Sequence, residues 1–145
     1  MYVNNEVGTV QPVQEAASIV KQYKPSILFH TDAVQGFGKY RIYPKRADID
    51  LLTASGHKIH GPKGIGFLYI GSQVKIRPIV FGGEQQKNIR SGTENVPGIA
   101  GLGRASEMIY RDMEMKSARM RELKSRVIEG VSKIEDTTVH GLTDE

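Results

Sequence analysis

The chain has 145 residues, of which 39% are hydrophobic and 25% are charged, a composition typical of one soluble globular domain or of part of one. The absence of cysteine excludes a disulfide framework, a thiolate metal site and a cysteine nucleophile within these residues. The net charge of +4 does not predict a nucleic-acid partner, because Lys and Arg alternate with Asp and Glu after Arg104.

The N-terminal region predicts one amphipathic helix after a polar start. Residues 1–6 do not resemble a secretory leader, and no apolar run approaches the roughly 20 residues that span a bilayer, so we expect a cytoplasmic protein without a membrane partner. Pro12 suits a first helical turn, and apolar residues recur on one helical face until Pro25. We therefore expect a helix between these two prolines.

Three short apolar runs follow and predict strands, at residues 27–32, 50–55 and 64–70. Strands that are joined partly through helices indicate an α/β layer. The segment 80–95 is rich in glycine, polar and charged residues and has no clean period. We expect it to be a long ordered loop of the kind that carries function.

The C-terminal region predicts a long helix. Apolar residues recur at helical spacing from about Pro97 to Ile134, and such a helix would span roughly 55 Å at about 1.5 Å per residue. This exceeds what a compact domain of this size needs, so we expect the helix to lead out of the domain or to lie along a neighbour. Residues 137–141 are typical of the start of a strand, which indicates that the chain stops inside a larger fold.

The segment Ser55-Gly56-His57-Lys58 directly follows a predicted strand and precedes a glycine-rich turn. Open α/β sheets bind ligands at the carboxyl ends of their strands, where a partly desolvated lysine amine becomes nucleophilic, so Lys58 is a candidate for a Schiff base. The alternative is an exposed loop lysine. Ser55 and His57 offer side-chain donors, and the glycines let backbone N–H groups approach an anion, so the segment also suits a phosphate. Its spacing matches neither a nucleotide P-loop nor a dinucleotide fingerprint.

Asp32 ends the first predicted strand, and Gln35 follows three residues later. A carboxylate at a strand end can stabilise a protonated ring nitrogen, as pyridoxal phosphate (PLP) requires, or it can be an ordinary turn residue. His30, Asp32, His57 and His60 are all able to bind metal, but the two later histidines lack the i, i+4 spacing of a zincin. We expect no metal site.

Four phrases occur in the order and spacing seen in cysteine desulfurases of the NifS/IscS type, which are PLP enzymes of aminotransferase class V. They are NNEVGT at 4–9, HTDAVQ at 30–35, SGHKIHGPKG at 55–64 and RSGTEN at 90–95. The resemblance covers nearly the whole chain. It implies an α/β fold that is part of the PLP-dependent transferase large domain, with a mixed, mostly parallel sheet, flanking helices and a long C-terminal linker helix.

The resemblance also implies domain bounds. Residues 1–96 would form the second half of the PLP-binding large domain, 97–136 the long helix that leads to the small domain, and 137–145 the truncated start of that small domain. The family chain is more than twice as long as this one. Its ring-stacking histidine, its carboxylate-binding arginine and its persulfide cysteine would lie outside these residues, so we expect this chain to be inactive alone.

For the cofactor ring, the resemblance assigns four residues. Lys58 matches the lysine that forms the Schiff base and moves the α-proton, and Asp32 matches the partner of the pyridine nitrogen. Gln35 and Asn5 match residues that donate hydrogen bonds to the phenolic oxygen. For the phosphate, Ser55 and His57 match ligands from the same subunit.

Thr93 matches a phosphate ligand that reaches across from the other subunit, which implies a homodimer. The alternative is that Thr93 merely precedes a helix capped by Asn95. The implied reaction converts L-cysteine to L-alanine and transfers the sulfur to an enzyme persulfide and then to an acceptor such as an iron–sulfur scaffold protein. Other readings are an aminotransferase or a selenocysteine lyase of the same class, or a catalytically silent folding or dimerisation module. The phrase at 90–95 favours the desulfurase.

Overall fold

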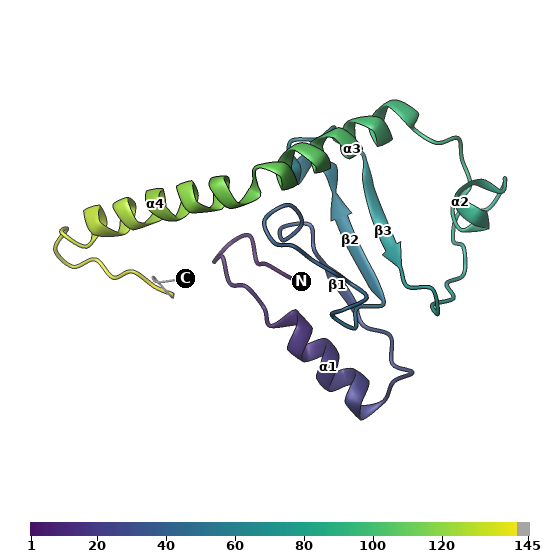
Figure 1. Cartoon of the computed structure of the whole chain (residues 1–145), viewed down its shortest axis with the longest axis horizontal. Helices are drawn as coiled ribbons and strands as arrows, with labels where there is room; N and C mark the ends of the chain where they lie inside the picture. Colours follow the sequence, from purple (N-terminus) through teal and green to yellow (C-terminus); the bar gives the residue numbers. More distant parts are fainter. Residues whose placement is uncertain (142–145) are drawn as a thin grey trace.

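The computed structural model describes residues 1–141 (Figure 1). Within this range, no helix is long and apolar enough to cross a membrane. The elements in chain order are α1 (Val13–Tyr23), β1 (His30–Asp32), β2 (Leu51–Ser55), the short 3-10 helix η1 (Gly56–Ile59), β3 (Gly66–Ile70), α2 (Gln85–Asn88), α3 (Val96–Arg111) and α4 (Met113–Val131).

The three strands form one mixed sheet in the order β1-β2-β3. β1 is parallel to β2, with Asp32 opposite Thr53, and β2 is antiparallel to β3, with Ser55 opposite Gly66. The N-terminal segment lies beside β1, since the Tyr2 N–H donates to the carbonyl of Asp32 at 2.7 Å. The predicted α/β fold with a mixed sheet is confirmed. The sheet was also expected to be mostly parallel, and the described strands form one parallel and one antiparallel pair.

The first strand is shorter than predicted. Residues 27–29 lie outside β1, and Ile27 and Leu28 are exposed. The cause is a change of partner: the Phe29 N–H donates to the carboxylate of Asp50 at 2.7 Å, and strand pairing begins only at His30. The predicted helix after Pro12 and the strands at 50–55 and 64–70 agree with α1, β2 and β3 to within two residues.

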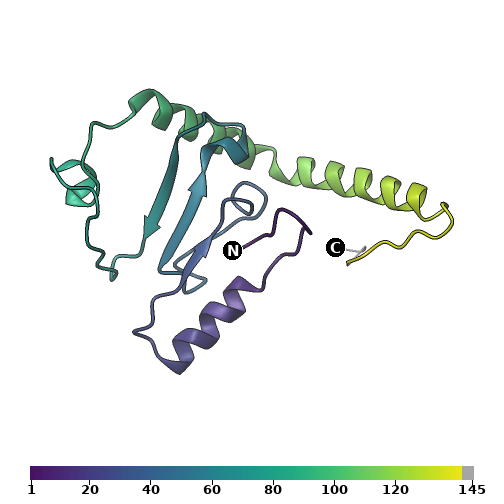
Figure 2. The same ribbon diagram turned by 180° about the vertical axis from the view of Figure 1, so that it is seen from behind.

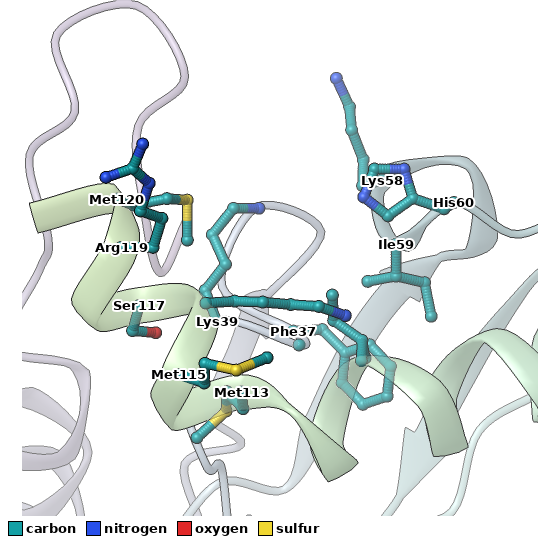
Figure 3. Close-up of a pocket in the computed structure, with 13 residues that line it drawn as sticks. Phe37, Lys39, Lys58, Ile59, His60, Met113, Met115, Ser117, Arg119 and Met120 are labelled. Carbon is teal, nitrogen blue, oxygen red and sulfur yellow. The ribbon is translucent and has the colours of Figure 1, made fainter. Parts of the chain in front are cut away.

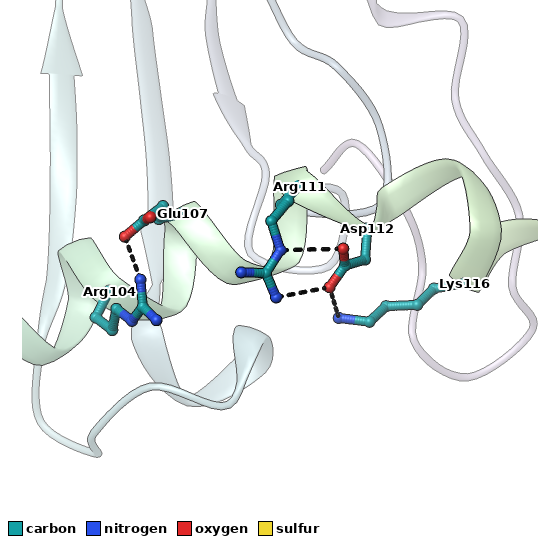
Figure 4. Close-up of polar contacts among 5 residues, drawn as sticks. All are labelled: Arg104, Glu107, Arg111, Asp112 and Lys116. Carbon is teal, nitrogen blue, oxygen red and sulfur yellow. Dashed lines mark hydrogen bonds and ion pairs between the residues drawn. The ribbon is translucent and has the colours of Figure 1, made fainter.

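The single long helix predicted over residues 97–134 is wrong in one respect, because it is divided at Asp112. This residue has φ −108° and ψ 16°, although its carbonyl still accepts the N–H of Lys116 at 3.0 Å. Its carboxylate binds Arg111 at 3.1 Å and Lys116 at 3.9 Å (Figure 4). The hydrogen bond from Arg111 is the main reason that the pKa of Asp112 is lowered. Beyond this point α4 extends away from the sheet (Figure 2).

The strand predicted from residue 137 is not formed in the described residues 137–141. The hydroxyl of Thr137 donates to the carbonyl oxygens of Val131 and Ile134, at 2.7 and 2.8 Å. The bond to Val131 reaches the last carbonyl of α4, and Ile134 lies just beyond the helix, so the segment turns back to the helix end instead of starting a strand. Residues 142–145, which the same prediction includes, lie outside the described residues.

An ion pair joins α1 to the start of the strands. Lys21 Nζ lies 2.6 Å from Asp50 Oδ2, and both side chains are mostly buried. Burial by itself would raise the pKa of Asp50, but the hydrogen bonds from Lys21 and from the Phe29 N–H, together with the charge of Lys21, lower it. Beside this pair lies the apolar core, formed by Val13, Ala33, Ile49, Leu52 and Ala54.

Thr31, in the middle of β1, is 2% exposed, and its hydroxyl has no hydrogen-bond partner among residues 1–141. A buried hydroxyl without a partner costs free energy, and valine has the same shape without this group. We expect Thr31→Val to raise the free energy of unfolding by about 1 kcal/mol, measured by denaturant titration. Thr31→Ser is the control, since it keeps the hydroxyl and loses a methyl group. A stability gain in the serine variant, or a loss in the valine variant, would contradict the assignment.

Candidate functional site

The carboxyl ends of β1 and β2 bring the predicted site residues to one edge of the sheet. Because the two strands are parallel, Asp32 at the end of β1 and Ser55 at the end of β2 lie at the same side. The chain then turns directly into η1, which carries His57 and Lys58. Sequence analysis placed Lys58 just after a strand, and this position is confirmed.

The turn that carries Lys58 is closed by backbone hydrogen bonds. The Gly56 N–H donates to the carbonyl of Ile65 at 2.9 Å, and the Gly61 N–H donates to the carbonyl of Gly56 at 2.8 Å. His60 ends η1 with a left-handed φ of 65°. The expectation that the glycine N–H groups would approach an anion is therefore wrong at residues 56 and 61, because both groups are used inside the turn.

Two polar side chains of this turn contact each other. Ser55 Oγ lies 2.7 Å from His57 Nδ1, a hydrogen bond whose donor depends on the tautomer of the ring. Ser55 is half-buried, whereas His57 and Lys58 are exposed. The bond to Ser55 orients the imidazole and leaves its Nε2 atom available to a ligand at the surface.

Asp32 has the geometry of a turn residue and still has one oxygen available. Its Oδ1 accepts the N–H of Val34 at 2.8 Å, as expected for an aspartate that stabilises a turn. Among the hydrogen bonds of residues 1–141, none involves Oδ2, and the side chain is exposed. The turn role and the functional role therefore do not exclude each other.

Among the described residues, no hydrogen bond joins the side chain of Gln35 or Asn5 to Asp32 or Lys58. Gln35 is half-buried, and its backbone carbonyl accepts Lys39 Nζ at 3.0 Å. Asn5 is exposed, and its amide donates to the carboxylate of Glu6 at 3.0 Å. The Asn5 side chain is therefore directed to a neighbour in sequence, while Tyr2 of the same segment donates its N–H to the carbonyl of Asp32.

Lys39, four residues after Gln35, was not among the candidate site residues predicted from the sequence. Although Lys39 is exposed overall, partial burial of its amine lowers its pKa, and the positive charge of Lys58 lowers the pKa further. Both lysines line a cleft of about 580 Å³ between η1 and the junction of α3 with α4, where Met113 and Met120 contribute apolar surface. In Figure 3 the Lys58 side chain extends away from these methionines. The cleft thus adjoins the candidate site without including Asp32 or Ser55.

Thr93 is not brought into contact with the other predicted residues. It is exposed in the connection between β3 and α3 and lines a different cleft, of about 860 Å³, beside β3. The connection is ordered, since Ser91 Oγ accepts the Gly83 N–H at 2.7 Å. Asn95 caps α3 by accepting the Gly98 N–H at 3.1 Å, as the alternative interpretation required. Among residues 1–141, no group of three His, Asp or Glu side chains is able to hold a metal ion.

Comparison with known proteins identifies the family. The model of the family described as aminotransferase class V matches residues 1–145. The chain belongs to the aminotransferase class V family. A curated relative, cysteine desulfurase IscS from Methanosarcina thermophila, is 48% identical over 141 residues, which are 97% of this chain and 34% of the relative. The chain thus spans about a third of the length of the curated relatives it matches.

Solved structures of family members have the same fold. A NifS-like protein superposes with a TM-score of 0.88 at 43% identity, over 92% of this chain and 36% of its own. A structure described as SspA in complex with cysteine superposes with a TM-score of 0.68 at 44% identity, over 73% of this chain and 30% of its own. The first superposition includes nearly all of the described sheet and helices.

The interaction between the two lysines is testable by titration. Replacing Lys58 with methionine removes a positive charge near Lys39, so we expect the pKa of Lys39 to rise, while burial keeps it below its ordinary value. NMR titration of ¹³C-dimethylated lysines in the cofactor-free protein measures this. Lys116→Met is the control, because Lys116 lines the same cleft but pairs with Asp112 at 3.9 Å. An unchanged Lys39 pKa in the Lys58→Met variant would contradict the proximity of the two amines.

Proposed function

We propose that this chain is a segment of a PLP-dependent cysteine desulfurase. The enzyme would convert L-cysteine to L-alanine and transfer the sulfur to a cysteine thiol, leaving a persulfide. The observation that carries the proposal is the grouping of Lys58, the Ser55–His57 pair and Asp32 at the carboxyl ends of two parallel strands. Its support is the 48% identity to a cysteine desulfurase over nearly the whole chain.

The side chains at this edge suit PLP by their chemistry. A phosphate needs donors, and the hydroxyl of Ser55 and the imidazole of His57 lie together within one turn of the amine of Lys58. A pyridinium nitrogen needs a carboxylate, and Asp32 has an oxygen without a bond among the described residues. One amine, one carboxylate and two phosphate donors form the set that such a cofactor requires.

Each residue then has a separate task. When bound, PLP supplies an electron sink for the α-carbon of the substrate. Asp32 would keep a proton on the ring nitrogen, and Ser55 with His57 would hold the phosphate. Lys58 would hold the cofactor through its amine, and the same amine would move a proton at the substrate α-carbon. Gln35 and Asn5 would donate hydrogen bonds to the phenolic oxygen once their amides turn toward it.

The substrate and the partners extend the proposal beyond these residues. The structure described as SspA in complex with cysteine supports L-cysteine as the substrate. The chain contains no cysteine, so the thiol that accepts sulfur would come from outside it, and an iron–sulfur scaffold protein would receive the sulfur next. We also propose a cytoplasmic location. Residues 1–96 would belong to the large domain, 97–136 to the linker helix and 137–145 to the small domain.

The central test locates the cofactor. We expect the visible absorbance of the whole enzyme with PLP to disappear on borohydride reduction, and peptide mapping to find the label on Lys58. Lys58→Ala should abolish the label, whereas Lys39→Ala, at the neighbouring amine, should leave it in place. A label on any other lysine would show that the central assignment is wrong.

A second test concerns assembly. We propose that Thr93 binds the phosphate in the partner subunit of a homodimer, supported by its exposure and by its place in a cleft that does not include Lys58. Thr93→Ala should weaken PLP binding by about 1 to 3 kcal/mol in an equilibrium titration. Asn95→Ala is the matched control, because it removes the cap of α3 and should lower stability by about 1 kcal/mol without changing PLP affinity.

Mixed dimers separate a shared site from an indirect effect. Subunits with Lys58→Ala and subunits with Thr93→Ala would each be defective, but a mixed dimer contains one site without either change. Recovery of activity on mixing is the expected result. No recovery, with subunit exchange demonstrated by mass spectrometry, would refute the shared site.

A further inference from the structure

One face of α3 packs against the turn that carries Lys58. Gly101, Ala105 and Ile109 are four residues apart, so they lie on the same side of the helix. This helix contacts η1 directly, and Figure 1 shows α3 crossing the end of β2, where η1 begins. The smallest residue of this face, Gly101, lies opposite Pro62, just after the turn.

The approach of Gly101 to Pro62 leaves no room for a side chain on the helix. A Cβ atom at residue 101 would lie 2.6 Å from Cγ and 3.0 Å from Cδ of Pro62. Carbon atoms in contact are normally about 3.5 to 4.0 Å apart. The proline ring is bonded to its own backbone nitrogen and cannot rotate away. An alanine at residue 101 must therefore displace the turn, the helix or both.

Two more glycines lie at close contacts between this turn and the segments around it. A Cβ atom at Gly61 would lie 3.0 Å from the carbonyl oxygen of Gly56 and 3.4 Å from Cβ of Ala105. A Cβ atom at Gly38 would lie 2.9 Å from Cγ2 of Ile59, which is itself buried. The backbone of the turn is thus enclosed on more than one side.

A displacement of Pro62 would reach Lys58 through the hydrogen bonds that close the turn. Gly61, the neighbour of Pro62, donates its N–H to the carbonyl of Gly56, and Gly56 donates to Ile65. Lys58 lies between the two ends of the first of these bonds. A displacement of the segment that α3 contacts would therefore also displace the backbone of Lys58, although the Lys58 side chain is exposed.

We propose that α3 sets the position of Lys58 for cofactor binding, and that Gly101 is a positioning residue because its lack of a side chain lets the turn approach the helix. This role rests on the proposed function of Lys58. Helix propensity opposes glycine in the interior of α3, so the residue at position 101 runs against the local preference of the helix.

The test compares two glycines of the same helix in the whole enzyme. Gly101→Ala introduces the clash with Pro62, whereas a Cβ atom at Gly103 meets nothing within 4 Å. Helix propensity favours alanine at both positions. We expect Gly101→Ala to weaken PLP binding about tenfold or more, as a misplaced catalytic group does, and to shift the pH at which the visible absorbance of the bound cofactor changes. Gly103→Ala should change neither quantity.

A second variant separates the contact from general damage to the helix. Pro62→Ala shortens the side chain that meets residue 101, so the double variant Gly101→Ala with Pro62→Ala should recover most of the affinity lost in the single variant. Hydrogen exchange of amides 56–61 in the cofactor-free enzyme gives a readout independent of the cofactor. Exchange should be faster in Gly101→Ala and return toward the original rate in the double variant.

The possible outcomes distinguish this inference from the proposed function. If borohydride labels a lysine other than Lys58 in the unmodified enzyme, the proposed function fails. If Lys58 is labelled and Gly101→Ala behaves like Gly103→Ala, the positioning role is wrong. A lower melting temperature of Gly101→Ala with unchanged PLP affinity and pH profile would also overturn it, because the glycine would then serve packing alone.

Discussion

The parallel pairing of β1 with β2 determines which side chains meet at the candidate site, because both strands must end at the same edge of the sheet. The Ala33 N–H extends this pairing by donating to the carbonyl of Thr53 at 2.9 Å, and so fixes the position at which the chain leaves β1. At the opposite end of the strands, the Lys21–Asp50 ion pair and the bond from Asp50 to the Phe29 N–H determine where pairing begins. The separation between Asp32 and the Lys58 turn is therefore set by contacts that are not part of the site.

α3 supports the site from a second direction. The Tyr110 hydroxyl accepts the Gly38 N–H at 3.1 Å, and its ring packs edge-on against Phe37 with centroids 5.3 Å apart. Gly38 belongs to the turn that follows Asp32 and Gln35, so the same helix contacts the chain after β1 and the chain after β2. Burial raises the pKa of Tyr110, as expected for a phenol enclosed between the helix and this turn. One helix thereby couples the positions of two turns that are distant in sequence.

The features that sequence analysis predicted correctly depend on near neighbours in the chain. Apolar periodicity after Pro12 predicted α1, and the apolar runs predicted β2 and β3 because each run lies within a single strand. The early end of the first predicted strand was missed, since Asp50 replaces the strand partner of Phe29 from 21 residues away. Lys39 was missed for the same reason, because it lines a cleft with Lys58 and with residues of α4 that are far away in the sequence. The division at Asp112 breaks no apolar period and so left no signal in the sequence.

The shape of the Lys58 turn and its position in the fold are determined by different contacts. The shape follows from local hydrogen bonds, such as that from Gly61 to Gly56, and from Gly66, where a Cβ atom would lie 2.5 Å from the carbonyl oxygen of Ala54. A glycine-rich segment that follows a strand predicts this shape from the sequence. The place follows from the contact of Pro62 with a helix that begins 34 residues later, at Val96. A protein that keeps the turn but alters the helix would keep the recognisable phrase at 55–64 while moving the amine relative to Asp32, so the phrase alone does not guarantee a working site.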